Sequence, residues 1–221
     1  MKFEAIIFDF DGVLIESEYV GNKQIADFLT AAGHPTSVED SMNRFMGLAG
    51  RDFHDAIERW IGGPLPEDFH AAREVADQRV LEEGVESVAG AVAFIRALPP
   101  DLPKAIASSS SIEWIERHLD HLGLRQVFVP HIYSGRTHVE RGKPAPDLYL
   151  HAAEALGADI ARTVIIEDSP VGVRGALASG AEVIGLCAGR HCMTGHADRL
   201  RALGVRHVAH DFGEVAELLA F

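Results

Sequence analysis

Short apolar runs alternate with amphipathic stretches over much of the chain. The runs are rich in Val and Ile and occupy Phe3–Asp9, Lys104–Ser108, Thr163–Glu167 and Glu182–Leu186. Runs of this kind, without strict polar alternation, are typical of parallel strands that are buried on both faces. Helical patterns lie between them, at Ile112–Leu122, Pro146–Leu156 and Val171–Ala178. This alternation predicts an α/β fold with a doubly wound, Rossmann-like parallel sheet.

A purely helical pattern interrupts this alternation between Glu16 and Glu86. Its helical segments are Ser17–Ala32, Val38–Phe45, Asp52–Trp60 and Glu67–Glu82. The block contains 6 Lys and Arg against 15 Asp and Glu, so it carries −9 of the total charge of −13. We therefore predict a core domain made of residues 1–15 and 87–221. An inserted all-helical cap domain would occupy residues 16–86.

The first strand ends in two carboxylates, Asp9 and Asp11. Ligands of open α/β sheets bind beyond the carboxyl ends of the strands. Alternate residues of an extended segment point the same way, so both carboxylates can face one site. One can attack phosphorus, and the other can exchange a proton with the leaving oxygen and with water. The alternative interpretation is a strand end followed by a solvated acidic loop.

Two later segments offer groups that could hold a phosphate. Ser108 ends a strand, and the serines that follow it open a helix whose free amide groups can bind an anion. Ser110 and Glu113 have capping-box spacing, so these serines could instead only cap the helix. Lys143 precedes a stiff Pro-Ala-Pro segment and could neutralise a phosphate. The alternative for Lys143 is a solvated side chain.

The fourth strand end carries the adjacent carboxylates Glu167 and Asp168. Buried carboxylates are costly unless they are paired or bind a metal. Mg²⁺ prefers oxygen ligands, which Asp9, Glu167, Asp168 and a backbone carbonyl can supply. A surface acidic loop is the alternative. Four such segments in order, each at a strand end, are far more specific together than any one alone.

These residues resemble the motifs of the haloacid dehalogenase (HAD) superfamily of phosphohydrolases. The segment that begins at Asp9 resembles the first motif, Ser108 the second, Lys143 the third, and Glu167 with Asp168 the fourth. The phrases DGVLIESE, GKPAPDLY and IIEDSPVGV resemble the β-phosphoglucomutase-like branch. That branch carries a helical cap directly after the first motif.

The resemblance implies a role for each matching residue. Asp9 resembles the nucleophile and Asp11 the general acid/base, while Ser108 and Lys143 resemble the phosphate-stabilising pair, with Ser109 beside them. Mg²⁺ would be held by Asp9, by the carbonyl of Asp11, and by the two carboxylates of the fourth motif, Glu167 and Asp168. The implied mechanism is phosphoryl transfer to Asp9 followed by hydrolysis.

Arg51 is the candidate substrate contact of the cap, in the loop Met46–Arg51. Phosphonatases of the superfamily use a cap lysine to form a Schiff base. A guanidinium cannot form this imine, but it can bind a phosphate or carboxylate through two hydrogen bonds. The alternative is a solvated residue at the start of a helix.

Phosphatase activity on a small phosphorylated metabolite, such as a sugar or polyol phosphate, fits these motifs best. The main alternative is a sugar-phosphate mutase of the β-phosphoglucomutase type. Such mutases carry a His at the cap hinge, near Gly21 here, but the first His of this chain is His34. A non-catalytic binding protein on the same scaffold is a further alternative, which loss of a motif carboxylate would favour. None is lost.

Composition and charge narrow the choice of partners. The net charge of −13 disfavours duplex nucleic acid and anionic membranes. No apolar run reaches the length of a membrane span. The N-terminus lacks the pattern of a secretory signal. We expect a small phosphate ester as partner, a monomer, and a reduced, cytoplasmic protein.

The remaining residues with metal-binding or aromatic side chains have plain interpretations. Cys192 lies between His191 and His196, so a zinc site is conceivable. The stretch shows no second ligand pair at a usual zinc spacing, and Ala188–Ala197 is therefore interpreted as a surface excursion near the edge of the core. Trp60 and Trp114 lie on amphipathic patterns and are expected to anchor cores.

Overall fold

The computed structural model describes residues 3–46, 48 and 50–219 of the chain. The chain divides into two compact units. The first, here called the core unit, consists of Met1–Glu16 and Glu86–Phe221. The second, here called the helical unit, consists of Ser17–Val85.

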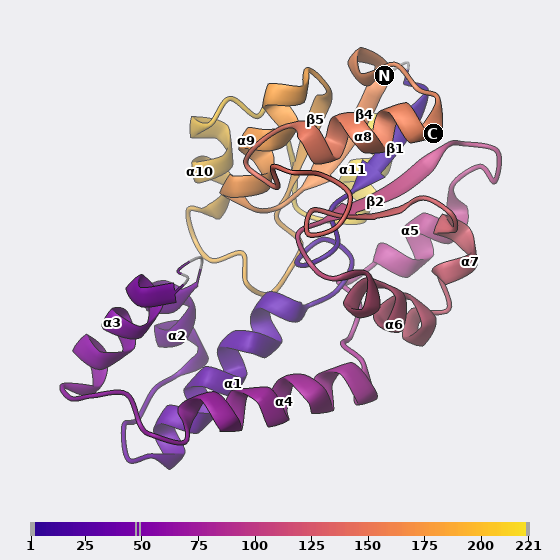
Figure 1. Cartoon of the computed structure of the whole chain (residues 1–221). Helices are drawn as coiled ribbons and strands as arrows, with labels where there is room; N and C mark the ends of the chain where they lie inside the picture. Colours follow the sequence, from indigo (N-terminus) through magenta and orange to yellow (C-terminus); the bar gives the residue numbers. More distant parts are fainter. Residues whose placement is uncertain (1–2, 47, 49, 220–221) are drawn as a thin grey trace. The chain divides into compact units, whose positions relative to one another are not determined.

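A six-stranded sheet is the centre of the core unit (Figure 1). Its strands are β1 (Ala5–Phe8), β2 (Lys104–Ser108), β3 (Ile132–Ser134), β4 (Thr163–Glu167), β5 (Glu182–Leu186) and β6 (His207–Ala209). They run parallel in the order β3-β2-β1-β4-β5-β6. The α/β prediction is confirmed. The order reverses beside β1, and this switch point is where doubly wound folds place their ligands.

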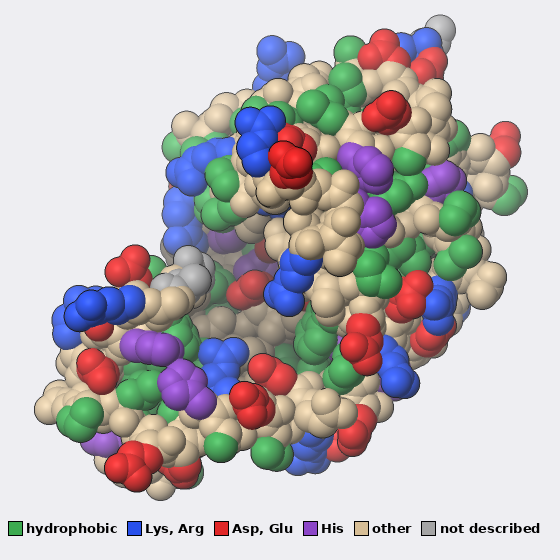
Figure 2. Space-filling view, viewed as in Figure 1, with side chains coloured by type: hydrophobic (Ala, Val, Ile, Leu, Met, Phe, Trp, Pro, Cys, Tyr) green, Lys and Arg blue, Asp and Glu red, His purple; other side chains and the backbone are tan. Residues whose placement is uncertain are grey.

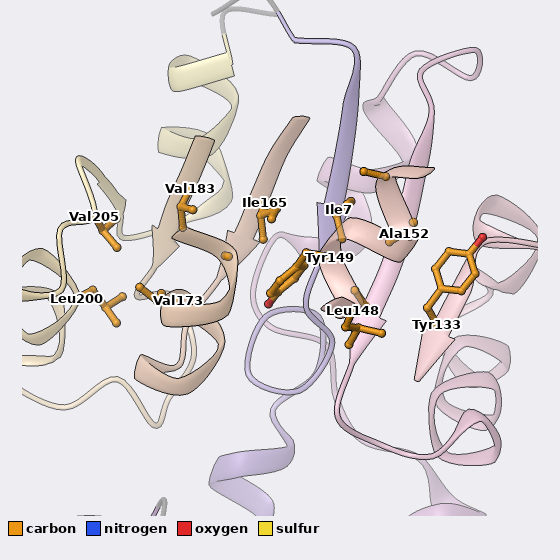
Figure 3. Packing of buried hydrophobic residues seen from close by; sticks show 14 residues of the cluster. Ile7, Tyr133, Leu148, Tyr149, Ala152, Ile165, Val173, Val183, Leu200 and Val205 are labelled. Carbon is orange, nitrogen blue, oxygen red and sulfur yellow. The ribbon is translucent and has the colours of Figure 1, made fainter. Parts of the chain in front are cut away.

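Helices cover both faces of this sheet, which explains the unbroken apolar runs. Ile7, Ile165 and Val183 belong to one cluster with residues of α8 (Asp147–Leu156) and α9 (Pro170–Ser179) (Figure 3). On the opposite face, the ring of Phe8 packs edge-on against Phe94 and Phe128, with ring centroids 6.3 and 5.9 Å apart. Neighbouring residues of one strand therefore enter different cores.

The remaining helices of the core unit complete these two layers. They are α5 (Ala91–Ala97), α6 (Ile112–Leu122), α7 (Arg125–Phe128), α10 (His196–Ala202) and α11 (Phe212–Leu219), with a 3₁₀ turn at Ile160–Arg162. The predicted bounds of β2, β4, β5 and α6 agree with the structure. Strands β3 and β6 were not predicted, because a run of three residues is too short for a periodic signal.

The helical unit packs four helices around an aromatic centre. They are α1 (Ser17–Ala31), α2 (Val38–Phe45), α3 (Gly50–Ile61) and α4 (Phe69–Glu83), and no strand occurs among the described residues of this unit. Leu29, Phe45, Ile57 and Phe69 form its buried centre. Trp60 packs partly buried against it and donates a hydrogen bond to Thr36 Oγ1 at 2.8 Å. Its anchoring role is as expected.

One face of the protein carries side chains of both charges. On the face shown in Figure 2, acidic and basic side chains are interspersed. Among the described residues, no helix has both the length and the apolar character to cross a membrane.

Candidate active site

Six of the predicted site residues lie at the carboxyl edge of the sheet, around the switch point. Asp9 directly follows β1, and Asp11 lies two residues further on. Ser108 is the last residue of β2, and Glu167 is the last residue of β4, followed by Asp168. Lys143 comes from the segment between β3 and α8. The parallel order of β2, β1 and β4 brings these side chains to one edge.

A buried ion-pair group forms around Lys143, whose side chain is 4% exposed. Its Nζ contacts Asp9 Oδ1 and lies 2.9 Å from Glu167 Oε1. Burial alone would lower the pKa of Lys143, but the carboxylates of Asp9 and Glu167 outweigh burial and raise it well above its usual value. The two carboxylates therefore favour the charged form of Lys143 at the end of β1.

Burial raises the pKa of Asp9 well above its ordinary value. The ammonium of Lys143 acts in the opposite direction, while the neighbouring carboxylates of Glu167, Asp168 and Asp11 add to the increase. Further positive charge placed beside Asp9 would therefore favour its ionised form.

Donors from several directions fix Glu167, which is fully buried. Its Oε1 accepts hydrogen bonds from Lys143 and from the Tyr149 hydroxyl, the latter at 3.0 Å. Its Oε2 accepts from the backbone N–H of Ser169 at 2.7 Å and from the Ser169 hydroxyl at 3.0 Å. Both oxygens thus have protein partners, and Glu167 anchors the ammonium of Lys143.

Asp11 has a more polar environment at the end of β2. Its carboxylate accepts hydrogen bonds from the hydroxyls of Ser108 at 3.2 Å and Ser110 at 2.6 Å. The indole N–H of Trp114 donates a third at 3.0 Å. Trp114 is partly buried, and the polar edge of its ring holds Asp11, a role that its amphipathic spacing did not predict.

The serines after β2 do not form the predicted capping box of Ser110 and Glu113. Ser111, not Ser110, caps α6, with its hydroxyl accepting from the Trp114 N–H at 3.2 Å. Ser110 is then free to turn its hydroxyl to Asp11. Ser109 is exposed, and its carbonyl accepts from Arg136 Nε at 3.0 Å. Ser108 accepts from the Ser110 N–H at 3.0 Å, which orients its hydroxyl.

The stretch Ala188–Ala197 is not the expected surface excursion. His191, 2% exposed, places Nε2 at 2.7 Å from Asp168 Oδ2. The ring occupies a space that two glycines leave open. A Cβ at Gly12 would lie 2.9 Å from His191 Cε1, and a Cβ at Gly189 would lie 2.5 Å from it. The stretch therefore folds back against the carboxylate edge and fixes Asp168.

The carboxylates of this edge form a cluster that fits a hard cation. Oxygen atoms of Asp9, Glu167 and Asp168 lie within 4.8 Å of one another, and all three residues are buried. Asp9 and Glu167 contact the Lys143 ammonium and Asp168 adds a third carboxylate to the cluster, so negative charge exceeds that of Lys143 when the three are ionised. Oxygen-only ligands are those that Mg²⁺ prefers. The donor set therefore suits a divalent cation.

Arg51 belongs to the helical unit and is placed only within it. It lies in the first turn of α3, its side chain is 91% exposed, and its Nε is 3.9 Å from Asp55 Oδ2. Gly47 and Ala49, which precede it in the proposed substrate loop, lie outside the described residues. Its contact with substrate stays a prediction.

The fold is that of the haloacid dehalogenase-like hydrolases. The sequence profile of haloacid dehalogenase-like hydrolases matches residues 3–180. The chain therefore belongs to the haloacid dehalogenase-like hydrolase family, as its motifs predict.

Curated relatives of the chain include phosphatases. It is 28% identical over 193 residues to the 6-phosphogluconate phosphatase of Escherichia coli, a match that covers 86% of this chain and 85% of the relative. It is also 28% identical over 191 residues to hexitol phosphatase A of the same organism, with 85% of each chain covered. The expectation of a HAD-like phosphatase is confirmed.

Solved structures of the family share the whole architecture. A HAD family hydrolase of Deinococcus radiodurans, solved with bound phosphate and sodium, has a TM-score of 0.89 at 32% identity and covers 99% of this chain and 96% of that one. A putative β-phosphoglucomutase of Thermotoga maritima has a TM-score of 0.74 at 25% identity, with 98% of both chains covered. The resemblance to the β-phosphoglucomutase-like branch is thus confirmed.

The packing around Glu167 makes a testable prediction about Gly172 in α9. A Cβ at Gly172 would lie 1.4 Å from Glu167 Oε1, whereas Gly21 in α1 has nothing within 4 Å. Gly21→Ala should therefore stabilise the protein by about 0.5–1 kcal/mol through helix propensity. Gly172→Ala should destabilise the protein by about 1–3 kcal/mol, because the added methyl group overpacks the space beside Glu167. Urea unfolding followed by circular dichroism measures both. Equal stability of the two variants would contradict the packing.

Proposed function

We propose that the protein is a Mg²⁺-dependent phosphatase that acts on a small sugar or polyol phosphate through an aspartyl-phosphate. The observation that carries this proposal is the buried group at the end of β1. There Asp9 is held by the ammonium of Lys143 and lies beside the carboxylates of Glu167 and Asp168. A carboxylate fixed by a cation, next to a second carboxylate two residues on, is equipped for nucleophilic and acid–base work.

In the first step, a carboxylate oxygen of Asp9 attacks phosphorus and the bond to the leaving oxygen breaks. Asp11 gives its proton to that oxygen, so an alcohol leaves and Asp9 carries the phosphoryl group. Ser108 donates a hydrogen bond to a phosphoryl oxygen, and Lys143 neutralises its charge. In the structure Ser108 bonds Asp11 at 3.2 Å, so the substrate contact replaces a long, weak bond.

In the second step, Asp11 takes a proton from water, whose oxygen attacks the phosphoryl group and releases Asp9 and inorganic phosphate. Asp9, the Asp11 carbonyl and Asp168 would hold Mg²⁺. Glu167 would add mainly its negative charge, because both of its oxygens already have donors. When bound, Mg²⁺ supplies positive charge that favours ionised Asp9 and stabilises the transferring phosphoryl oxygens. Together these groups must lower the barrier by roughly 20 kcal/mol.

Comparison with relatives supports the substrate class. By name, one relative acts on 6-phosphogluconate and another on hexitol phosphates, which are a sugar-acid phosphate and polyol phosphates. We propose that the helical unit, which corresponds to the predicted cap of residues 16–86, selects among such esters, with Arg51 as a substrate contact. We propose further that the protein works as a monomer in the cytoplasm.

The decisive experiment is a panel of phosphate esters assayed with and without Mg²⁺. We expect inorganic phosphate from sugar and polyol phosphates, and only when Mg²⁺ is present. The panel includes β-glucose 1-phosphate with a catalytic amount of the 1,6-bisphosphate. Accumulation of glucose 6-phosphate without free phosphate would favour the mutase. No turnover of any ester by folded protein would favour the non-catalytic alternative.

Asp9→Asn tests the nucleophile. The amide keeps the size of the side chain but cannot form the acyl-phosphate, so turnover should fall by at least about 10³-fold, a loss of about 4 kcal/mol of transition-state stabilisation. Phosphate release and the unfolding midpoint are measured on the same preparation. Asp27→Asn, on the exposed surface of α1, is the matched control. Activity of the Asp9 variant within a few-fold of wild type would remove Asp9 from its role.

His191→Ala tests the support of Asp168. Partners that hydrogen-bond a metal ligand are typically worth about 10–100-fold in metal affinity, so Mg²⁺ binding measured by calorimetry without substrate should weaken by that factor. His191→Gln, which keeps an N–H donor, should restore part of the affinity. His207→Ala, on β6 beside Glu182, is the control. A variant that merely loosens the fold would show a lower unfolding midpoint and no rescue by Gln.

A further inference from the structure

The two cysteines of the chain lie close to a histidine, and all three residues come after Asp168 in the sequence. Cys187 follows β5, Cys192 lies in the stretch that folds back onto Asp168, and His196 begins α10. Ligand atoms of all three lie within 4.8 Å of one another. Sequence spacing did not predict this group, because Cys187 is five residues from Cys192 and belongs to no usual zinc pattern.

The folded-back stretch positions these three side chains by specific contacts. Its backbone is tied to the start of the chain, since the N–H of Arg190 donates to Glu16 Oε2 at 2.9 Å. The Cys192 thiol donates a weak hydrogen bond to the carbonyl of Leu186, the residue before Cys187, at 4.0 Å. Cys192 Sγ also lies 3.4 Å from His191 Nε2. The sulfurs are thus held next to each other while both remain free thiols.

The ring of His196 is buried and held by a backbone carbonyl. It is 4% exposed, and its Nε2 lies 2.7 Å from the backbone carbonyl of Asp168. A carbonyl only accepts, so Nε2 carries the proton and Nδ1 carries the lone pair. Ligating histidines usually donate their second N–H to a carbonyl or carboxylate in this way. Arg199 Nη2 is 3.4 Å from Nδ1, a contact long enough to yield readily.

We propose that Cys187, Cys192 and His196 form a second cation site, specific for Zn²⁺ or another thiophilic divalent ion. Two thiolates and one imidazole are soft ligands that select Zn²⁺ over Mg²⁺. The thiol protons leave to solvent as the metal–sulfur bonds form. Three protein ligands leave one tetrahedral position for water. Both cysteines are only partly buried, so an ion can reach the sulfurs.

This site differs from the carboxylate group in the hardness of its ligands. Asp9, Glu167 and Asp168 offer oxygen atoms alone, whereas the second group offers sulfur and nitrogen. The two are adjacent, because His196 bonds the Asp168 carbonyl and His191 bonds its carboxylate. Binding of Zn²⁺ to the second group does not depend on the proposed phosphatase activity. The two proposals can therefore fail separately.

The test is a Co²⁺ titration of the reduced full-length protein in saturating Mg²⁺, with absorption as the readout. We expect a thiolate-to-Co²⁺ charge-transfer band that saturates at one ion per chain and disappears when Zn²⁺ is added. Cys192→Ser and Cys187→Ser should each weaken Co²⁺ binding by more than about 100-fold. Losing a residue that only hydrogen-bonds a metal ligand typically costs about 10–100-fold. Asp9→Asn, which alters only the carboxylate group, should keep the band.

Three outcomes would overturn the second site. These are the absence of a thiolate band in wild type, a band that survives Cys192→Ser, or a band that is lost equally in Asp9→Asn. Should the serine variants fold poorly, alkylation decides: Zn²⁺ should protect both thiols of the wild-type protein from iodoacetamide at least about tenfold, by mass action on a tight site. Alkylation at the same rate with and without Zn²⁺ counts against the proposal. His196→Asn should also weaken Co²⁺ binding, whereas His207→Asn, at a histidine outside the group, should leave it unchanged.

Discussion

The burial of Lys143 among carboxylates is the interaction on which the rest of the site depends. An ammonium with 4% exposure would be very costly alone, and so would Asp9 and Glu167. Each is tolerable only because the others are present and because Tyr149 and Ser169 occupy the remaining lone pairs of Glu167. Removing one partner would leave an uncompensated buried charge. The group is therefore fixed as a unit, which preorganises Asp9 without any movement of the protein.

This charge group also explains why neighbouring positions are small or polar. The first turn of α9 approaches Glu167 so closely that only glycine fits at residue 172. At Gly12, where φ is +80°, an added Cβ would lie 2.4 Å from Asp168 Oδ2. These glycines let backbone approach carboxylates whose positions the ion pairs have already set. Loop conformation and helix packing near the site thus follow from electrostatics at the strand ends.

Much of the fold and of the candidate site was predictable, because both depend on local patterns. Apolar runs such as Thr163–Glu167 carry the strand signal and end in the polar residue that the site uses. The supporting residues had no such signal. Tyr149 lies on an apolar helix face, Trp114 has amphipathic spacing, and His191 sits in a stretch without periodicity. Their roles arise only when distant segments meet at the sheet edge, which local sequence does not encode.

Local sequence also gives no signal for the group of Cys187, Cys192 and His196. The way this group is assembled relates it to the carboxylate group. Spacing rules detect metal sites whose ligands come in local pairs, whereas here a strand end, a folded-back stretch and a helix start each contribute one ligand. That stretch reaches the sheet edge because His191 occupies the space between Gly12 and Gly189 and bonds Asp168. The contact that fixes a proposed Mg²⁺ ligand is therefore also the contact that brings the thiols and His196 together.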